Sequence, residues 1–408
     1  MITRNPYIAN LKAGYLFPEI AKRRREFAAS HPEAKIISLG VGNTTELILP
    51  HINEGLTEGA RRLGTAEGYS GYQDEGMAAL REKISSVFYK GKFGIDEIFI
   101  SDGAKCDIGR LQILFGAGVK IAVQDPSYPV YVDGSVLTGA AGGWESGGGY
   151  AGITYLPCTA ENNFFPNLDL IPRSCLIYFC SPNNPTGAVA DRAQLASLVK
   201  AAIDKQCIII FDAAYSEFIR DSLLPKTIYE IDKAETCAIE VNSFSKPAGF
   251  TGVRLGWSVV PKAVKYAGSE SGEAAFSVNA DWSRIAGTIF NGASNIAQAG
   301  GLAALDETGL KEIRELTDFY LGNAKLIRDA LVKLGIKCIG GDNSPYIWAH
   351  FPGRDSWEVF AEILEKCHVV TTPGAGFGPA GQGFIRFSAF GHRADVEEAC
   401  GRLRNFVF

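Results

Sequence analysis

A lysine set among hydroxyl groups and glycines stands out between residues 241 and 256, where the chain reads VNSFSKPAGFTGVRLG. The segment follows an apolar run and places Lys246 close to Ser243, Ser245 and Arg254. A lysine amine in a confined site can form a Schiff base with a carbonyl compound. The serine hydroxyls and the arginine suit a phosphate group. Because the same pattern also fits an ordinary solvated loop, the prediction depends on other segments.

A second candidate is Asp212, which directly follows an apolar run. A buried carboxylate is costly unless a cation pairs with it, and a protonated pyridine ring is such a cation. Pyridoxal phosphate carries the ring, the carbonyl and the phosphate in one molecule. Tyr215 and Asn184, which also follow apolar runs, are placed to hydrogen-bond the ring oxygen. The alternative for Asp212 is a cap at the end of a strand.

Two further segments offer anion sites. Residues 103–105 read Gly-Ala-Lys at a predicted strand-to-helix turn, with Asp102 available as a cap, and a helix N-terminus favours phosphate. Lys105 opposes the helix dipole there, so it either points to solvent or meets a substrate anion. Arg386 alternates with apolar residues on a predicted strand. Its planar guanidinium suits a substrate carboxylate, and the alternative is an arginine on the surface of the strand.

Short apolar runs alternate with amphipathic helices through the first two thirds of the chain, which predicts an α/β fold with a mostly parallel sheet covered by helices on both faces. In such sheets the chemistry lies beyond the carboxyl ends of the strands. Each polar cluster named above falls at such an end. The predicted strands are residues 97–100, 119–123, 175–179, 207–211, 236–241 and 254–260.

The pattern changes after Pro261 to a long amphipathic helix and a small α+β lobe. We predict an N-terminal arm with part of the small domain at 1–44, a large domain at 45–289 and a small C-terminal domain at 290–408. The glycine-dense residues 142–149 predict a surface turn. The small lobe is expected to hold a helix at 310–334, strands at 346–351, 369–372 and 383–388, and a closing helix with Val396, Cys400 and Leu403.

The bulk composition is that of an ordinary globular protein, with 408 residues, 46% hydrophobic and 21% charged. A net charge of -5 gives no basic surface for nucleic acid. The nine cysteines show no metal-binding spacing and sit mostly in apolar runs, so we expect reduced core thiols and a cytoplasmic protein. The five scattered histidines offer no metal site. No segment resembles a signal peptide or a membrane span.

Taken in order, these motifs resemble those of the fold-type I pyridoxal-phosphate enzymes, specifically the class I and II aminotransferases. The resemblance implies a large domain with a mostly parallel sheet, a smaller α+β domain and pyridoxal 5'-phosphate as cofactor. It extends from Gly40 to Arg386. The residues that carry it are Ser181-Pro182-Asn183-Asn184-Pro185-Thr186-Gly187, Asp212 with Tyr215, and Ser243, Ser245 and Lys246 with Arg254 and Gly256.

Other segments resemble the LL-diaminopimelate aminotransferases more narrowly. That family interconverts LL-2,6-diaminopimelate plus 2-oxoglutarate with tetrahydrodipicolinate plus glutamate, in the synthesis of lysine and cell-wall precursors. The segments are residues 14–20, 67–72, 101–107, 125–131 and 290–294.

The resemblance implies a role for each matching residue. Lys246 would form the Schiff base, and Asp212 would face the pyridine nitrogen. Tyr215, the third catalytic candidate, and Asn184 would contact the ring oxygen, while Tyr128 would stack on the ring. The phosphate would be held by Ala104, Lys105, Ser243, Ser245 and Arg254, together with Tyr72 from the partner subunit of a homodimer.

The same resemblance implies which residues would bind the substrate. Arg386 would bind the α-carboxylate, and Lys105 would meet the second carboxylate of diaminopimelate. Tyr15, Gly42, Tyr128, Asn184 and a partner-subunit Asn291, which is also assigned to the cofactor, would complete the site. The segment after Tyr72 is one residue shorter than is usual in the family, so either Asp74 or Glu75 would meet the distal ammonium.

Two alternatives remain from the sequence. Another fold-type I activity, such as a C-S lyase, a cyclopropane-forming synthase or an aminotransferase of different specificity, would use the same cofactor residues. A non-catalytic regulator on the same fold is disfavoured because Lys246, Asp212 and Arg386 occur together.

Overall fold

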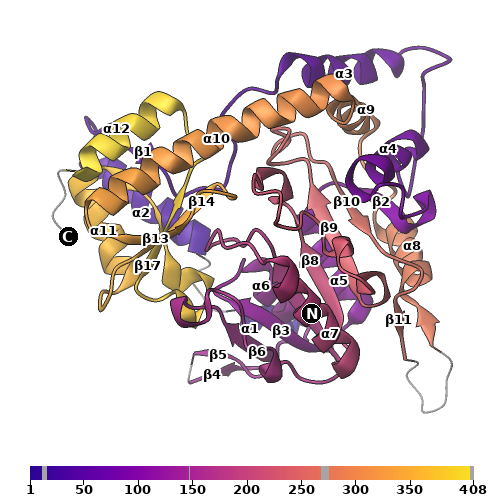
Figure 1. The fold of residues 1–408 in the computed structure, drawn as a ribbon, viewed down its shortest axis with the longest axis horizontal. Coiled ribbons are helices and arrows are strands. Elements are labelled where there is room, and N and C mark those ends of the chain that lie inside the picture. The colour runs from indigo at the N-terminus through magenta and orange to yellow at the C-terminus, as the bar shows by residue number, and fades with distance from the viewer. Residues whose placement is uncertain (12–15, 147, 268–274, 405–408) are drawn as a thin grey trace.

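The chain forms two lobes, and the long helix α10 (Glu307–Lys333) runs from one to the other (Figure 1). The computed structural model describes residues 1–11, 16–146, 148–267 and 275–404. The larger lobe is built on a seven-stranded sheet in the order β2-β10-β9-β8-β7-β3-β6. The strands are β2 (Ile98–Ser101), β10 (Gly256–Val259), β9 (Ala238–Ser243), β8 (Ile208–Asp212), β7 (Cys175–Cys180), β3 (Lys120–Asp125) and β6 (Ile153–Pro157).

The sheet is parallel from β9 to β6, and only β10 runs antiparallel to its neighbours within it. Parallel neighbours need a long crossover, usually a helix, whereas residues 244–255 between β9 and β10 form only turns. That short connection reverses the chain at the carboxyl edge of the sheet. Gly256 therefore pairs with both Ser243 and Ser101.

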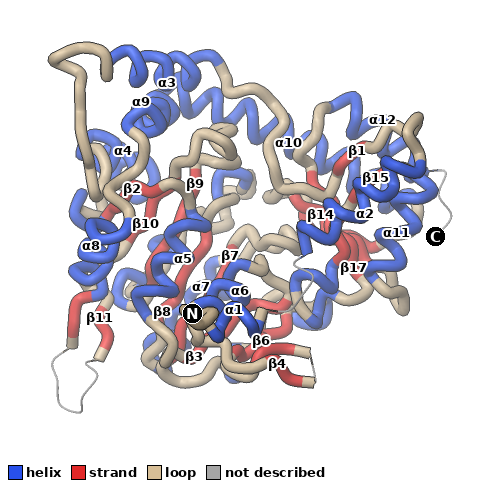
Figure 2. The backbone as a smooth tube through the Cα atoms, turned by 180° about the vertical axis from the view of Figure 1, so that it is seen from behind, coloured by secondary structure: helices blue, strands red, loops and turns tan. Residues whose placement is uncertain are grey.

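Alternate residues of the central strands feed two separate hydrophobic cores, which explains why these strands read as continuous apolar runs. On β7, Ile177 and Phe179 pack in one core with residues of α4 and α7. Leu176 and Tyr178 pack in the other with residues of α5, α6 and α8, the helices in front of the sheet in Figure 2. The prediction of a mostly parallel sheet with helices on both faces is confirmed.

Some helices begin at a side-chain cap and are followed by a residue in the left-handed conformation, as in α7 and α11. In α7, the side chain of Asp191 accepts a hydrogen bond from the backbone of Gln194, and Gln206, the residue after the helix, has a left-handed conformation. The helices are α1 (Pro6–Asn10), α2 (Leu16–Ser30), α3 (Pro50–Arg62), α4 (Ala78–Tyr89), α5 (Ala104–Phe115), α6 (Val130–Leu137), α7 (Arg192–Lys205), α8 (Val278–Ile289), α9 (Asn295–Ala304), α11 (Ser356–Cys367) and α12 (Arg393–Arg404).

The smaller lobe packs α2, α10, α11 and α12 with a four-stranded antiparallel sheet of order β13-β14-β17-β16. Its strands are β13 (Lys337–Gly340), β14 (Tyr346–His350), β16 (Thr372–Pro373) and β17 (Phe384–Ser388). The N-terminal segment joins this lobe, because β1 (Ile37–Ser38) pairs with β15 (Val369–Val370). The lobes also meet where the backbone N–H of Ser127 donates to the carbonyl of Phe377 at 2.9 Å.

The sequence prediction was wrong or incomplete at several strands. It missed β6 and β13, and residues 369–372 divide into β15 and β16, which belong to different sheets. The glycine-dense segment predicted as a surface turn contains a small hairpin of β4 (Trp144–Glu145) and β5 (Gly149–Tyr150), in which Trp144 packs edge-on against Tyr150 at 5.0 Å. A second hairpin joins β11 (Lys265–Tyr266) and β12 (Phe276–Ser277). The domain boundaries remain predictions.

Within the described ranges, no helix has both the length and the apolar character needed to cross a membrane.

Candidate active site

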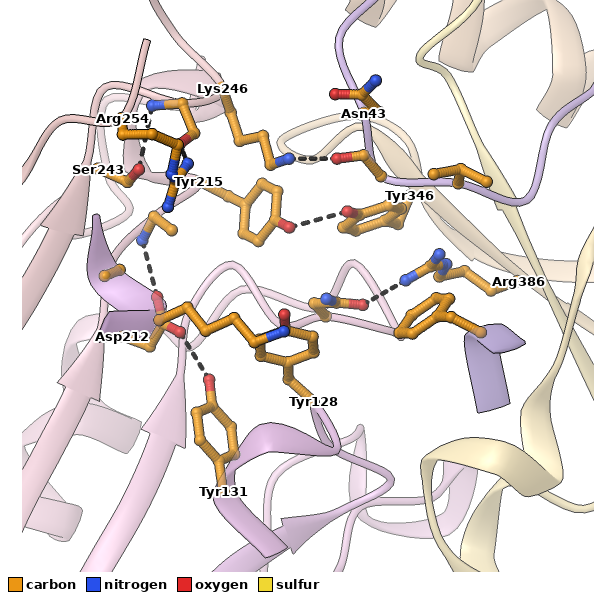
Figure 3. A pocket seen from close by; sticks show the side chains of 18 residues that line it. Asn43, Tyr128, Tyr131, Asp212, Tyr215, Ser243, Lys246, Arg254, Tyr346 and Arg386 are labelled. Atoms are coloured by element: carbon orange, nitrogen blue, oxygen red, sulfur yellow. Dashed lines mark hydrogen bonds between the residues drawn. The ribbon is translucent and has the colours of Figure 1, made fainter. Parts of the chain in front are cut away.

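A cavity of about 300 Å³ lies between the two lobes, at the carboxyl ends of β7, β8 and β9 (Figure 3). Its size is at the lower end of the range for small-molecule sites. The small lobe contributes Arg386, and the N-terminal segment contributes Gly42. Twelve of the predicted site residues line it: Gly42, Ala104, Lys105, Tyr128, Asn184, Asp212, Tyr215, Ser243, Ser245, Lys246, Arg254 and Arg386.

Asp212 is a buried carboxylate at the end of β8, and it forms no ion pair with any residue that the structure describes. Its Oδ2 accepts a hydrogen bond from the Tyr131 hydroxyl at 2.7 Å, and its Oδ1 accepts one from the backbone N–H of Ala214 at 3.1 Å. Burial raises the pKa of Asp212, while these hydrogen bonds lower it. A ligand cation facing Asp212 would offset this burial.

Lys246 is a half-buried lysine whose pKa lies well below its usual value. Burial lowers its pKa to about 7, and the nearby positive charges of Arg386 and Arg254 act in the same direction. Its Nζ donates a hydrogen bond to the backbone carbonyl of Gly42 across the cavity. A neutral lysine amine is the nucleophilic form, so the site favours Schiff-base chemistry near neutral pH.

The N-terminus of α5 and the loop before β10 form an anion cradle. Arg254 donates to Ser245 Oγ at 3.3 Å, and its guanidinium passes so close to Gly103 that a Cβ there would lie 2.6 Å from Nη2. Gly103 has φ 127°, which also favours glycine. No side chain in the described chain caps α5, so its backbone N–H groups are available to an anion.

The predicted cap for α5 was wrong. Asp102 pairs instead with Arg110 at 2.9 Å, and Arg110 also contacts Asp107 at 3.3 Å. The arginine, two turns into the helix, draws the carboxylate away from the N-terminus. The first turn of α5 is therefore left open toward the cavity.

Arg386 lies in the core of the site and is 1% exposed, so the surface alternative is wrong. Its Nη1 donates to Asn184 Oδ1 at 2.7 Å, and Nη2 donates to the carbonyl of Gly40 at 2.5 Å. The guanidinium also stacks on Tyr346 at 4.5 Å. Within the described chain it has no carboxylate partner, and its Nε has no acceptor. Burial lowers the pKa of Arg386, and a substrate carboxylate would relieve that cost.

Two tyrosines in the cavity, Tyr131 and Tyr346, were missed as site residues. The hydroxyl of Tyr346 lies 2.8 Å from that of Tyr215, and both rings are buried. Gly42 is close by, because a Cβ there would lie 2.4 Å from the Tyr346 hydroxyl. The position of Tyr131 three residues after Tyr128 could have indicated its role. No local pattern marks Tyr346, which comes from the other lobe.

Lys105 and Tyr128 both line the cavity. Lys105 is exposed, and its Nζ lies 5.9 Å from the centre of the Tyr128 ring. Tyr128 is half-buried at the turn before α6. This lysine lines the cavity, so its side chain is available to a ligand as well as to solvent.

Tyr72 and Asn291 lie outside the cavity of their own chain. Both are exposed, Tyr72 at 85%. Their two segments pack together, since Asn295 Nδ2 donates to the carbonyl of Ser70 at 3.0 Å and a Cβ on Gly292 would lie 2.0 Å from the carbonyl of Gln73. Tyr15 lies outside the described residues.

Asp74 and Glu75 differ in their surroundings. Glu75 pairs with Arg81 at 2.8 Å and accepts a hydrogen bond from Ser283 at 3.0 Å. Asp74 is exposed and has no side-chain partner in the described chain. Of these two carboxylates, Asp74 is the one without a side-chain partner in the described chain.

The fold and this cavity define a class of enzyme. Residues 34–403 match the model of the family "Aminotransferase class I and II", and the chain belongs to that family. Class I and II aminotransferases in general use pyridoxal phosphate.

More narrowly, the chain is similar to proteins named as LL-diaminopimelate aminotransferases. It is 51% identical to the one from Protochlamydia amoebophila, over 99% of this chain and 98% of that one. It is 54% identical to a probable chloroplastic one from rice, over 99% of this chain and 86% of that one. The solved structure of the enzyme from Chlamydomonas reinhardtii matches with a TM-score of 0.94 and 53% identity, over 99% of this chain and 98% of that chain.

Proposed function

We propose that this protein transfers an amino group between LL-2,6-diaminopimelate and 2-oxoglutarate, forming tetrahydrodipicolinate and glutamate reversibly, in lysine and cell-wall precursor synthesis. The observation that carries the proposal is the buried Arg386, which has no anionic partner in the described chain and shares one cavity with Lys246 and Asp212. The similarity to named LL-diaminopimelate aminotransferases supports the choice of substrate.

The residues of the cavity fit pyridoxal 5'-phosphate. Lys246 would hold its carbonyl carbon through the side-chain amine, and Asp212 would supply the counter-charge for the pyridine nitrogen. Asn184 and Tyr215 are placed for the ring oxygen, and Tyr128 for the ring face. The phosphate would be held by Ala104, Lys105, Ser243, Ser245 and Arg254. When bound, this cofactor withdraws electrons from the substrate α-carbon.

The protein's own groups then position the substrate and move its proton. Arg386 holds the α-carboxylate, which fixes the α-hydrogen relative to Lys246. The Nζ of Lys246, whose pKa is lowered to about 7, accepts the α-proton and later returns it. Asp212 would favour the protonated form of the ring nitrogen when the cofactor is bound, and Tyr131 holds Asp212 in place through its hydroxyl.

Lys105 is proposed to bind the second carboxylate of diaminopimelate, with Gly42 and Tyr15 beside it. Its position at a helix N-terminus then has a chemical reason, because the substrate brings an anion to that point. The free carboxylate of Asp74, presented by a partner subunit, is proposed to bind the distal ammonium.

We also propose a homodimer in which Tyr72 of the partner subunit reaches the phosphate and Asn291 of the partner subunit reaches the substrate. The exposure of Tyr72 supports this arrangement. Mixing the variants Lys246→Ala and Tyr72→Ala, each of which removes a residue proposed for the site, tests it. A mixed dimer holds one site with both residues intact, so the mixture should be more active than the two unmixed variants added together. If the activity of the mixture after subunit exchange equals that sum, the sites are not shared between subunits.

The substrate is tested by half-reactions without a keto acid. We expect LL-diaminopimelate and glutamate each to convert the bound cofactor to its stable amine form, read from its absorbance, with LL-diaminopimelate preferred over its stereoisomers. If aspartate or glutamate reacts while LL-diaminopimelate does not, the protein is an aminotransferase of another specificity. Elimination products in place of the amine form would indicate a lyase.

The cytoplasm is the proposed location, on the basis of the free cysteines.

A further inference from the structure

Two cysteines face each other at the amino ends of β7 and β8, away from the candidate active site. The Sγ atoms of Cys175 and Cys207 lie 3.4 Å apart. Both side chains are buried, at 2% and 4% exposure. The six-residue strand β7 separates Cys175 from the active-site edge of the sheet by about 17 Å.

The backbone places this pair in register. Leu176 pairs with Ile208 in the parallel ladder, so Cys175 and Cys207 stand beside each other one position earlier. Both belong to the core beneath α7, so their side chains lie on the same face of the sheet. Neighbouring strands are about 4.8 Å apart, which lies within the Cα separation of about 4.4 to 6.8 Å that a disulfide allows. To form the bond, the two Sγ atoms must approach from 3.4 Å to about 2.05 Å.

The two thiols differ in acidity. The hydrogen bond from the Cys175 thiol lowers the pKa of Cys207, and the positive charge of Lys205 acts in the same direction. That ammonium is held in place by three backbone carbonyls between residues 168 and 171. The same hydrogen bond and burial raise the pKa of Cys175. We therefore expect Cys207 to ionise before Cys175 and to attack first. The Cys207 thiol also lies 3.3 Å from the carbonyl oxygen of Pro172.

A cavity of about 550 Å³ lies against both cysteines, and Gln206, Lys265 and Tyr266 also line it. It gives a small reagent room beside the sulfur atoms. All nine cysteines are free and lie in the described ranges. Among them, only this pair has its sulfur atoms in hydrogen-bond contact, so oxidation should be selective.

We propose that Cys175 and Cys207 form a dithiol site that low-molecular-weight disulfides, such as oxidised glutathione, convert to an intramolecular disulfide. The Cys207 thiolate attacks one sulfur of the reagent, forms a mixed disulfide and releases one thiol. The Cys175 thiolate then attacks the sulfur of Cys207 and releases the second thiol. The protein loses two electrons and two protons, and the reagent gains them as two thiols.

The test equilibrates the folded holoenzyme with oxidised glutathione, blocks the remaining thiols with iodoacetamide and digests with trypsin. We expect tryptic peptides 174–192 and 206–220 to be recovered as one cross-linked species. Peptide 174–192 also contains Cys180, so the Cys175→Ser variant assigns the bond. That variant should lose the cross-link and retain a glutathione adduct on Cys207. The matched control Cys237→Ser, from the same cavity, should keep the cross-link.

A second measurement uses stability. The bond would close a loop between residues separated by 32 positions, which restricts the unfolded chain. We expect oxidised wild type to unfold at a higher denaturant concentration than the reduced protein, and Cys175→Ser to show no such difference. Recovery of Cys175 and Cys207 as separately alkylated thiols after exposure to oxidised glutathione alone would overturn the proposal. A stable glutathione adduct in wild type without the cross-link would do so as well.

Discussion

Replacing Arg386 by lysine keeps the positive charge but removes the planar guanidinium that the substrate carboxylate is proposed to bind. The lysine can make one charge-assisted hydrogen bond where arginine can make two, and Asn184 Oδ1 loses the donor that now lies at 2.7 Å. One such bond contributes about 1.5–3 kcal/mol. We therefore expect binding of amino-acid substrates to weaken about 10- to 150-fold.

The assay follows cofactor absorbance in single half-reactions as the concentration of glutamate or LL-diaminopimelate is raised. Both substrates carry the α-carboxylate, so the binding of both should weaken by a similar factor, whereas the affinity for the cofactor should change little. The matched control is Arg314→Lys on the exposed side of α10, where the arginine pairs with Asp318 at 3.2 Å. Unchanged substrate binding in Arg386→Lys, or a loss confined to one substrate, would refute the assignment of Arg386 to the α-carboxylate.

Four further outcomes are expected. Lys105→Ala should weaken the binding of LL-diaminopimelate about five-fold and the binding of glutamate less. Equal losses of binding for the two substrates in half-reactions would leave Lys105 with a phosphate role alone. Asp74→Ala should weaken the binding of LL-diaminopimelate selectively. Glu75→Ala should instead lower the thermal unfolding midpoint, because it breaks the contacts with Arg81 and Ser283. The reverse pattern would exchange the two roles. The rate at which apoprotein recombines with pyridoxal phosphate should rise with pH through about 7, because the neutral amine of Lys246 is the reactive form and its pKa is lowered to about 7; a rise only near pH ~10 would mean an unperturbed lysine. Tyr346→Phe removes the hydroxyl partner of Tyr215 and should shift the pH midpoint of the bound cofactor's absorbance, and an unchanged midpoint would show that the pair does not act on the cofactor.

Much of the large lobe could be predicted because its signals are local. The apolar runs that became β7, β8 and β9 are buried on both faces of the sheet, and each is followed by polar residues at its carboxyl end. Strands with weaker patterns were missed, such as β6, in which half-buried residues mix with buried ones, and β13, in which no residue is fully buried. The prediction that Asp102 caps α5 was also wrong, because Arg110, two turns into that helix, pairs with the Asp102 carboxylate.

The sequence by itself determined which chemical groups the protein has and at which strand ends they lie, because strand periodicity and turn residues act over short distances along the chain. Lys246, Asp212 and Asn184 could be placed at one edge of the sheet on that basis. Only the tertiary structure decided that Arg386 is buried against Asn184, that Tyr346 meets Tyr215, and that Cys175 meets Cys207. Those contacts depend on how the two lobes pack and on which strands become neighbours. Burial then lowers the pKa of Lys246, a property that no short segment of the chain can specify.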